Sequence, residues 1–112
     1  MRNARSGHVL ARRLEGAFDS PSRNRGLLGR ASLGPDEALA LAPCTSIHTF
    51  FMRFSIDVVF VRRDGVVIQK YSDVRPWRLR AAWRSFAVVE LPTGVLARTD
   101  TQVGDVLELR MS

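Results

Sequence analysis

The sequence predicts a mainly β fold of the α+β class: one compact antiparallel β-barrel or sandwich-like domain, with a short amino-terminal helix and a helical turn near residue 95. Three observations favour this class. Short runs rich in β-branched residues outnumber helical segments, two of these runs are joined by Asp64-Gly65, and no segment repeats at a fixed period. Because hairpin-linked strands leave unpaired edges, a small protein has to close or cover its sheet.

Length and composition predict one domain over residues 1–112. We expect an ordered core over about residues 7–110, with residues 1–6 as a flexible start. The hydrophobic fraction of 46% and the charged fraction of 25% are those of a globular protein. No run reaches the roughly 20 apolar residues that a spanning helix needs, so no transmembrane segment is expected.

The amino-terminal part contains a mixed stretch and a helix signal. Residues 8–15, HVLARRLE, are expected to form a first strand. A short helix is expected from Pro21 to Leu28, because Ser20 can cap it and proline is tolerated in the first helical turn. Gly29 is expected to end this helix.

The central part is expected to be extended. Residues 37–43 alternate with period two and end at a proline, which favours a short strand over a helix. Apolar residues then occupy every second position from Phe50 to Phe60, which gives a continuous apolar face in an extended chain. Val59 and Val61 make the other face apolar as well. We therefore expect one strand over residues 50–61 that becomes fully buried towards its end.

The clearest local signal is a hairpin. Asp64-Gly65 tolerates the positive backbone angles of a two-residue type I′ turn, which would place Val61 opposite Ile68. Further elements are expected in the carboxy-terminal part: a strand over residues 86–91, a helical turn over residues 95–98 and a strand over residues 106–110.

The chain is strongly basic, with a net charge of +6 and a pI of about 11.2. Arginine supplies 16 of the 17 basic residues, a bias that codon usage in a GC-rich genome explains more easily than selection for phosphate binding does. The distribution is more informative. Residues 1–30 carry seven Arg against two acids, and residues 75–84 carry four Arg and no acid. Nucleic acid is therefore a partner to be tested, although it is not the favoured one.

Cys44 is the single cysteine, so no internal disulfide can form, which agrees with a reducing compartment. The amino terminus is basic but lacks the apolar stretch of about 7 to 15 residues of a signal peptide. We expect a cytoplasmic protein.

Five sequence blocks occur in an order and spacing typical of a known family. They are GLLGR from Gly26, SIHTFFMRFSIDVVFVRRDG from Ser46, PWR from Pro76, VVELPTG from Val88 and VGDVLEL from Val103. Together they resemble the uncharacterised bacterial family called domain of unknown function 192, over about residues 7–109. The resemblance implies a compact, predominantly β domain, barrel-like or sandwich-like, with a short amino-terminal helix. It implies no reaction. The residues that match are candidates for a shared role, structural or functional: His48, Thr49, Met52, Asp57, Pro76, Trp77, Arg78, Glu90 and Gly94.

Cys44 and His48 would be neighbours on a helix, where they could form a metal or nucleophile pair. In an extended chain they lie roughly 13 Å apart, too far for one metal ion or one hydrogen bond. We therefore expect a packed, non-catalytic Cys44 and a core Met52. No catalytic residue, metal ligand or cofactor is predicted.

Asp57 and Glu90 each lie in an apolar strand sequence, where an unpaired buried carboxylate costs several kcal/mol. Partners for Asp57 are exposed backbone amides at a strand break, or an arginine such as Arg78. We expect Arg78 to reach Asp57 or Glu90 and to close its connection over the end of the sheet. An alternative is that the two carboxylates act as acid and base in a hydrolase-like enzyme.

The segment VRPWRLRAAWRSF mixes arginines with two tryptophans, Trp77 and Trp83. Such a segment can bind single-stranded nucleic acid or an anionic surface through residues 75–84. The alternative is a long connection that its tryptophans hold in place, with the arginines in solvent.

The leading hypothesis is a non-enzymatic β domain that binds a small molecule or a protein. The candidate binding residues are His48, Thr49, Asp57, Trp77, Arg78 and Glu90. His48 and Thr49 would place an imidazole and a hydroxyl at the mouth of a strand.

Overall fold

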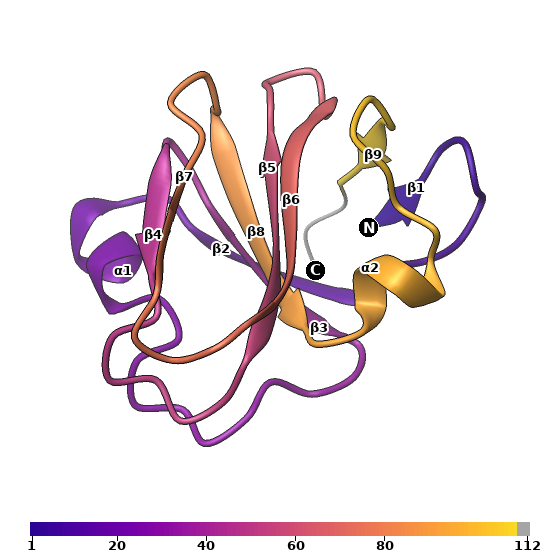
Figure 1. Ribbon diagram of the computed structural model, residues 1–112. Coiled ribbons are helices and arrows are strands. Elements are labelled where there is room, and N and C mark those ends of the chain that lie inside the picture. Colours follow the sequence, from indigo (N-terminus) through magenta and orange to yellow (C-terminus); the bar gives the residue numbers. More distant parts are fainter. Residues whose placement is uncertain (110–112) are drawn as a thin grey trace.

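The computed structural model describes residues 1–109, and a five-stranded sheet forms its centre (Figure 1). The strand order is β2-β3-β8-β5-β6, with β2 parallel to β3 and the other pairs antiparallel. The strands are β2 (Arg13–Ala17), β3 (Glu37–Leu41), β5 (Ile56–Val61), β6 (Val67–Val74) and β8 (Ala87–Pro92). The sheet stays open, so the fold is mainly β and sandwich-like but is not a closed barrel.

Two smaller strand pairs and two short helices cover this sheet. One pair joins β1 (Arg2–Asn3) to β9 (Leu107–Glu108), and the other joins β4 (Ser46–His48) to β7 (Leu79–Ala81). The helices are α1 (Ser20–Arg25) and α2 (Val95–Arg98). In Figure 1, α1, β4 and β7 lie on one side of the sheet, and α2, β1 and β9 lie on the other.

Each side of the sheet has its own hydrophobic core. On β5, Ile56, Val58 and Phe60 pack on the side of α1 and β4, while Val59 and Val61 pack on the side of α2. Alternate residues of a strand point to opposite faces, so a strand covered on both faces is apolar throughout. This explains why all six residues of β5 are buried.

Both helices lie where the sequence predicted them, but the boundaries of the first helix differ from the prediction. A helical turn over residues 95–98 was predicted, and α2 confirms it. The amino-terminal helix is shorter than predicted: Asp19 caps it, accepting a hydrogen bond from the Ser22 N–H, and Gly26 ends it instead of Gly29. Gly26 has a φ of 48°, where a residue with a side chain is rare, so the chain leaves the helix three residues early.

The amino terminus differs from the prediction. The expected strand over residues 8–15 starts only at Arg13, and residues 1–6, expected outside the core, contribute β1. Asn3 is fully buried, and its side chain donates to Thr101 and Asp105. These contacts are about 100 residues away along the chain, so no local pattern indicates them.

The hairpin exists, but its turn has three residues instead of two. Arg62 O accepts from the Gly65 N–H at 2.9 Å, and the Arg62 N–H donates to Val66 O at 3.0 Å. Val61 therefore pairs with Val67 and not with Ile68. Gly65 has the expected positive φ, 87°, in the position that a three-residue hairpin loop reserves for glycine.

The predicted strand over residues 50–61 is interrupted. β4 ends at His48, the chain turns at Phe50 and Phe51, and β5 begins at Ile56. Phe51 has a φ of 65°, which is incompatible with a strand. The strand predicted over residues 106–110 is observed at Leu107–Glu108, and its end at residue 110 lies outside the described residues.

Candidate functional site

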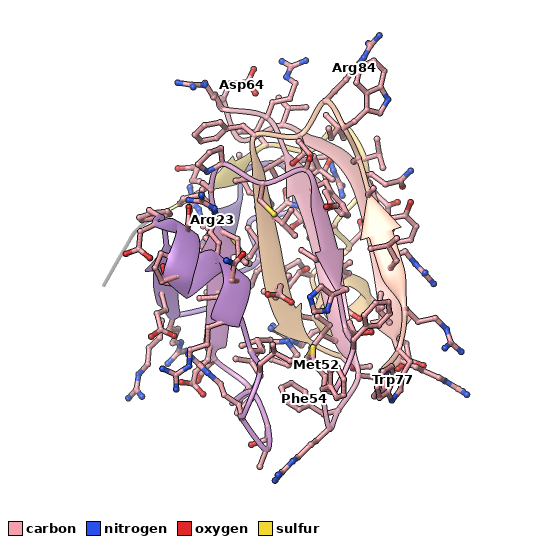
Figure 2. All side chains as sticks on the ribbon, turned by 90° about the vertical axis from the view of Figure 1, so that its left-hand side faces the viewer. Arg23, Met52, Phe54, Asp64, Trp77 and Arg84 are labelled. Atoms are coloured by element: carbon pink, nitrogen blue, oxygen red, sulfur yellow. The ribbon has the colours of Figure 1, made fainter. Side chains whose placement is uncertain are left out.

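A pocket of about 420 Å³ opens between α1, β4 and the sheet. Its inner wall is buried and mostly apolar, formed by Leu27, Leu41, Ile47, Met52 and Glu90. Its outer wall is exposed and polar, formed by Asn24, Arg25, Ser46 and His48. Figure 2 views the molecule from this side, with Arg23 on α1 and Met52 on the same face.

Glu90 is the one acidic residue of the pocket wall. It lies in the middle of β8 and is only 3% exposed. Its carboxylate has no hydrogen bond or ion pair with any of residues 1–109, and Oε1 lies beside Gly26 of the opposite wall. Within residues 1–109, every fully enclosed side-chain oxygen or nitrogen has a hydrogen-bond partner. The unpartnered oxygens of Glu90 are therefore not fully enclosed and reach the open space of the pocket.

Burial raises the pKa of Glu90 to about 7, and the positive charge of Arg30 opposes that rise. The cause is the loss of water around the charged form, because no hydrogen bond replaces it. At neutral pH the side chain therefore exchanges a proton readily, and it can either accept or donate a hydrogen bond inside the pocket.

Cys44 and His48 also contribute to the pocket wall. The Cys44 thiol donates to Ser46 O at 3.0 Å, and burial raises the pKa of this thiol, which makes the nucleophilic thiolate scarcer. The His48 ring stacks on Phe50 with 5.0 Å between centroids. Among residues 1–109, no three His, Cys, Asp or Glu side chains are arranged to hold a metal ion.

Asp57 lies outside this pocket. It is fully buried, and its carboxylate accepts three backbone hydrogen bonds: from Asp73 at 2.9 Å, Gly94 at 3.1 Å and Leu96 at 3.0 Å. Of the two partners considered for Asp57, backbone amides are therefore confirmed. The carboxylate joins the start of α2 to the end of β6.

The register of the sheet separates Asp57 from Glu90. Asp57 is paired with Leu91, and Glu90 is paired with Val58. Paired residues share a face and successive residues alternate, so Asp57 points towards α2 and Glu90 points towards α1. An acid–base pair needs both groups at one substrate, so the hydrolase arrangement of these two carboxylates is wrong.

The prediction that Arg78 reaches Asp57 or Glu90 is also wrong. Arg78 is exposed, and its guanidinium group contacts the carbonyl oxygens of Pro76 and Trp77, each at 3.4 Å. The physical reason is that backbone N–H groups already satisfy Asp57, while Glu90 faces the pocket instead of the connection. Arg78 is therefore free to contact a partner.

Thr49 is a fully buried junction between the loops on either side of β4 and β7. Its hydroxyl donates to Arg75 O at 2.6 Å and accepts from the Arg78 N–H at 2.8 Å. Its carbonyl oxygen accepts from the N–H groups of Met52 and Trp77. Thr49 thus holds residues 49–52 against residues 75–78.

The tryptophans of residues 75–84 lie apart. Trp77 contacts Phe50 and Phe51, whereas Trp83 is 81% exposed and packs beside Arg84. Figure 2 shows Trp77 and Arg84 at opposite ends of the molecule. The segment therefore does not form one continuous binding surface, because β7 carries its two halves in opposite directions.

The wall that α1 contributes was missed in the sequence. Arg23, Asn24 and Arg25 precede the GLLGR block, whose Gly26, Leu27 and Leu28 also line the pocket. The block was noted only as part of the family resemblance. A glycine followed by two leucines after a short helix is a signal for a helix end packed against a core, and it could have placed this wall.

Fold and site together define a small, mainly β, sandwich-like protein with a pocket built around one buried carboxylate. Among residues 1–109 no helix has the length and apolar character needed to cross a membrane. A model of the family domain of unknown function 192, described as "Uncharacterized ACR", matches residues 1–109, and the chain belongs to this family.

Relatives and solved structures agree with this assignment. UPF0127 proteins of Pyrococcus furiosus and Pyrococcus abyssi are each 36% identical over 64 residues, 56% of this chain and 54% of theirs. The chain thus spans about half the length of these curated relatives.

A protein of unknown function from Novosphingobium aromaticivorans superposes with a TM-score of 0.77 at 26% identity, over 86% of this chain and 74% of that one. A structure from Sinorhizobium meliloti superposes with a TM-score of 0.77 at 24% identity, over 85% of this chain and 79% of that one. At this identity the likeness concerns the fold alone.

Proposed function

We propose that this domain binds a small organic ligand in the pocket between α1 and β4, and that the ligand donates a hydrogen bond to Glu90. The observation that supports this most is the carboxylate itself, which is buried in the pocket wall and has no hydrogen bond or ion pair with any of residues 1–109. An unpaired buried carboxylate costs several kcal/mol, and a ligand donor recovers part of that cost. Glu90 is therefore better explained by binding than by stability.

The pocket supports a ligand with a polar end and an apolar body. Small-molecule sites typically have volumes of about 300 to 1,000 Å³ and combine apolar walls with a few polar groups. Here the apolar wall comes from Leu41, Ile47 and Met52, and Glu90 is the polar group within it. The ligand body would lie against these side chains while its donor reaches Glu90.

The binding role needs no reaction, and this agrees with the preference for a non-enzymatic domain. His48 and Arg25 at the opening would contact the outer end of the ligand. We keep the cytoplasm as the expected location because the single cysteine suits a reducing compartment. A protein partner would have to insert a side chain with the same chemistry into the pocket.

The test is native mass spectrometry of protein purified from its own host, followed by ligand-observed NMR with a library of small amines, amides and alcohols. We expect binders that compete with one another, and binding weakened at least tenfold in Glu90→Gln. Glu108→Gln is the matched control, because Glu108 is an exposed carboxylate on the other side of the sheet, paired with Arg2. An absence of binders, or equal binding by Glu90→Gln, would refute the proposal.

A further inference from the structure

Four aromatic rings form a continuous row beside the pocket: His48, Phe50, Trp77 and Phe51, hereafter the aromatic row. His48 stacks on Phe50 at 5.0 Å and 29°, and Phe50 stacks on Trp77 at 5.8 Å and 26°. Phe51 lies 4.6 Å from Trp77 on a tilted plane. The row joins two loops that are about 25 residues apart in sequence.

Two rings of the row are largely in solvent. Phe51 is 73% exposed and Trp77 is 56% exposed, so burial does not explain their position. Both residues also have left-handed backbones, with φ of 65° and 68°. For a bulky residue this conformation is strained, and the hydrogen bonds of Thr49 hold it in place. Strain of this kind is commonly found at binding sites.

Exposed arginines lie next to the aromatic row in sequence. Arg53, Arg75 and Arg78 are exposed, and none of them forms an ion pair with another of residues 1–109. Residues 44–56 and 75–89 contain no acidic residue. Asp73 is the exposed carboxylate next to this region in sequence, and its side chain forms no ion pair with any of residues 1–109.

We propose that the aromatic row and these three arginines bind single-stranded nucleic acid. Exposed aromatic rings stack with unpaired bases of any sequence, and guanidinium groups contact the phosphates between the bases. A lipid bilayer is less suited, because the rings stack on one another instead of projecting as an apolar tip. The proposal does not depend on the Glu90 pocket.

The experiment measures fluorescence anisotropy of labelled dT12 and rU12 at several salt concentrations. Trp77→Gly removes the ring and also relieves the backbone strain, since glycine readily adopts a positive φ, so folding is retained. We expect about tenfold weaker binding for this variant, the size of one lost base stack. Trp83→Gly, at the opposite end of β7, is the matched control and should change binding less than about twofold.

Charge variants test the phosphate contacts. Arg75→Ala and Arg78→Ala should each reduce the slope of log K against log salt by about 0.7, the value for one phosphate of a single strand. Arg84→Ala should leave the slope unchanged. Asp73→Asn should strengthen binding, because it removes the neighbouring negative charge and asparagine tolerates the φ of 51° at this position.

The proposal would be overturned by an absence of oligonucleotide binding at low salt, or by equal losses of binding in Trp77→Gly and Trp83→Gly. It would also be overturned if Trp77→Gly lost heparin binding to the same extent as dT12 binding, or if the protein bound vesicles with anionic lipids more tightly than dT12. Heparin carries charge without bases, so it separates stacking from charge attraction. Preference for an acidic peptide over dT12 would likewise assign the surface to protein binding.

Discussion

Asp57 and Glu90 lie on adjacent strands, β5 and β8, but their side chains leave opposite faces of the sheet. Asp57 accepts three backbone hydrogen bonds inside the protein, whereas Glu90 has no partner among residues 1–109 and faces a pocket. Two carboxylates in similar apolar strands therefore have different surroundings, and the difference comes from the register of one strand pair.

Asp57 should act as a structural anchor for α2. The asparagine oxygen of Asp57→Asn can still accept from the N–H groups of Gly94 and Leu96, but its NH2 group then faces the Asp73 N–H. One buried N–H loses its acceptor and the charge that strengthened the other two bonds is removed, so we expect about 1 to 3 kcal/mol of destabilisation in urea unfolding. Asp36→Asn changes an exposed carboxylate and should be within 0.5 kcal/mol or so of the original protein. Equal stabilities of the two variants would show that the anchor is unimportant.

Thr49 should be required for the loops that carry the aromatic row. Thr49→Val keeps the side-chain shape but removes the hydroxyl, leaving Arg75 O and the Arg78 N–H without this partner, and we expect a loss of about 1 to 3 kcal/mol. Thr49→Ser keeps the hydroxyl and should lose less. Circular dichroism melting of the two variants checks this order, and a valine variant more stable than the serine variant would contradict it.

The elements that the sequence predicted correctly are those determined by residues close together along the chain. The buried strand β8, the helical turn α2 and the glycine of the hairpin follow from β-branched runs and turn residues near them in sequence. The strand predicted over residues 50–55 is absent although the period-two pattern of apolar residues is there. The cause is Thr49, which bonds to the loop at residues 75–78 and bends the chain at that point. A contact of this range leaves no periodic trace.

The site was only partly predictable for the same reason. Glu90 was identified because a carboxylate in an apolar strand needs an explanation, yet the sequence does not say which face it occupies. A shift by one residue would have exchanged the surroundings of Asp57 and Glu90. The wall formed by α1 depends on how the helix packs on the sheet, which is a tertiary property.

Gly65 should be the least replaceable glycine of the hairpin region. A Cβ built at Gly65 lies 2.5 Å from Leu107 O, and its φ is 87°. Gly29 has nearly the same φ, 85°, and a Cβ built there meets no atom within 4 Å from the rest of residues 1–109 apart from its two chain neighbours, so it is a matched control. Gly29→Ala should cost about 1 kcal/mol from backbone strain, and Gly65→Ala should cost clearly more because β9 has to move. Similar melting temperatures for the two variants would show that the Leu107 backbone can move away from the new Cβ without a loss of stability.

Glu90 should make folding stability depend on pH in the direction opposite to a usual salt-bridged carboxylate. Its pKa in the folded protein is about 7, above the ordinary value of 4.5. Between these values the folded state binds more protons than the unfolded state, so stability falls as pH rises from 4.5 to 7 and then levels off. The shift corresponds to about 3 kcal/mol of folding free energy.

Glu90→Gln removes this pH dependence, so the variant should be more stable than the original protein at pH 8, and the difference should shrink towards pH 4.5. Urea unfolding of both proteins across this range measures the difference, and Glu108→Gln serves as the exposed control. A difference that stays constant with pH, or that grows on acidification, would mean that the Glu90 carboxylate has a partner in solution.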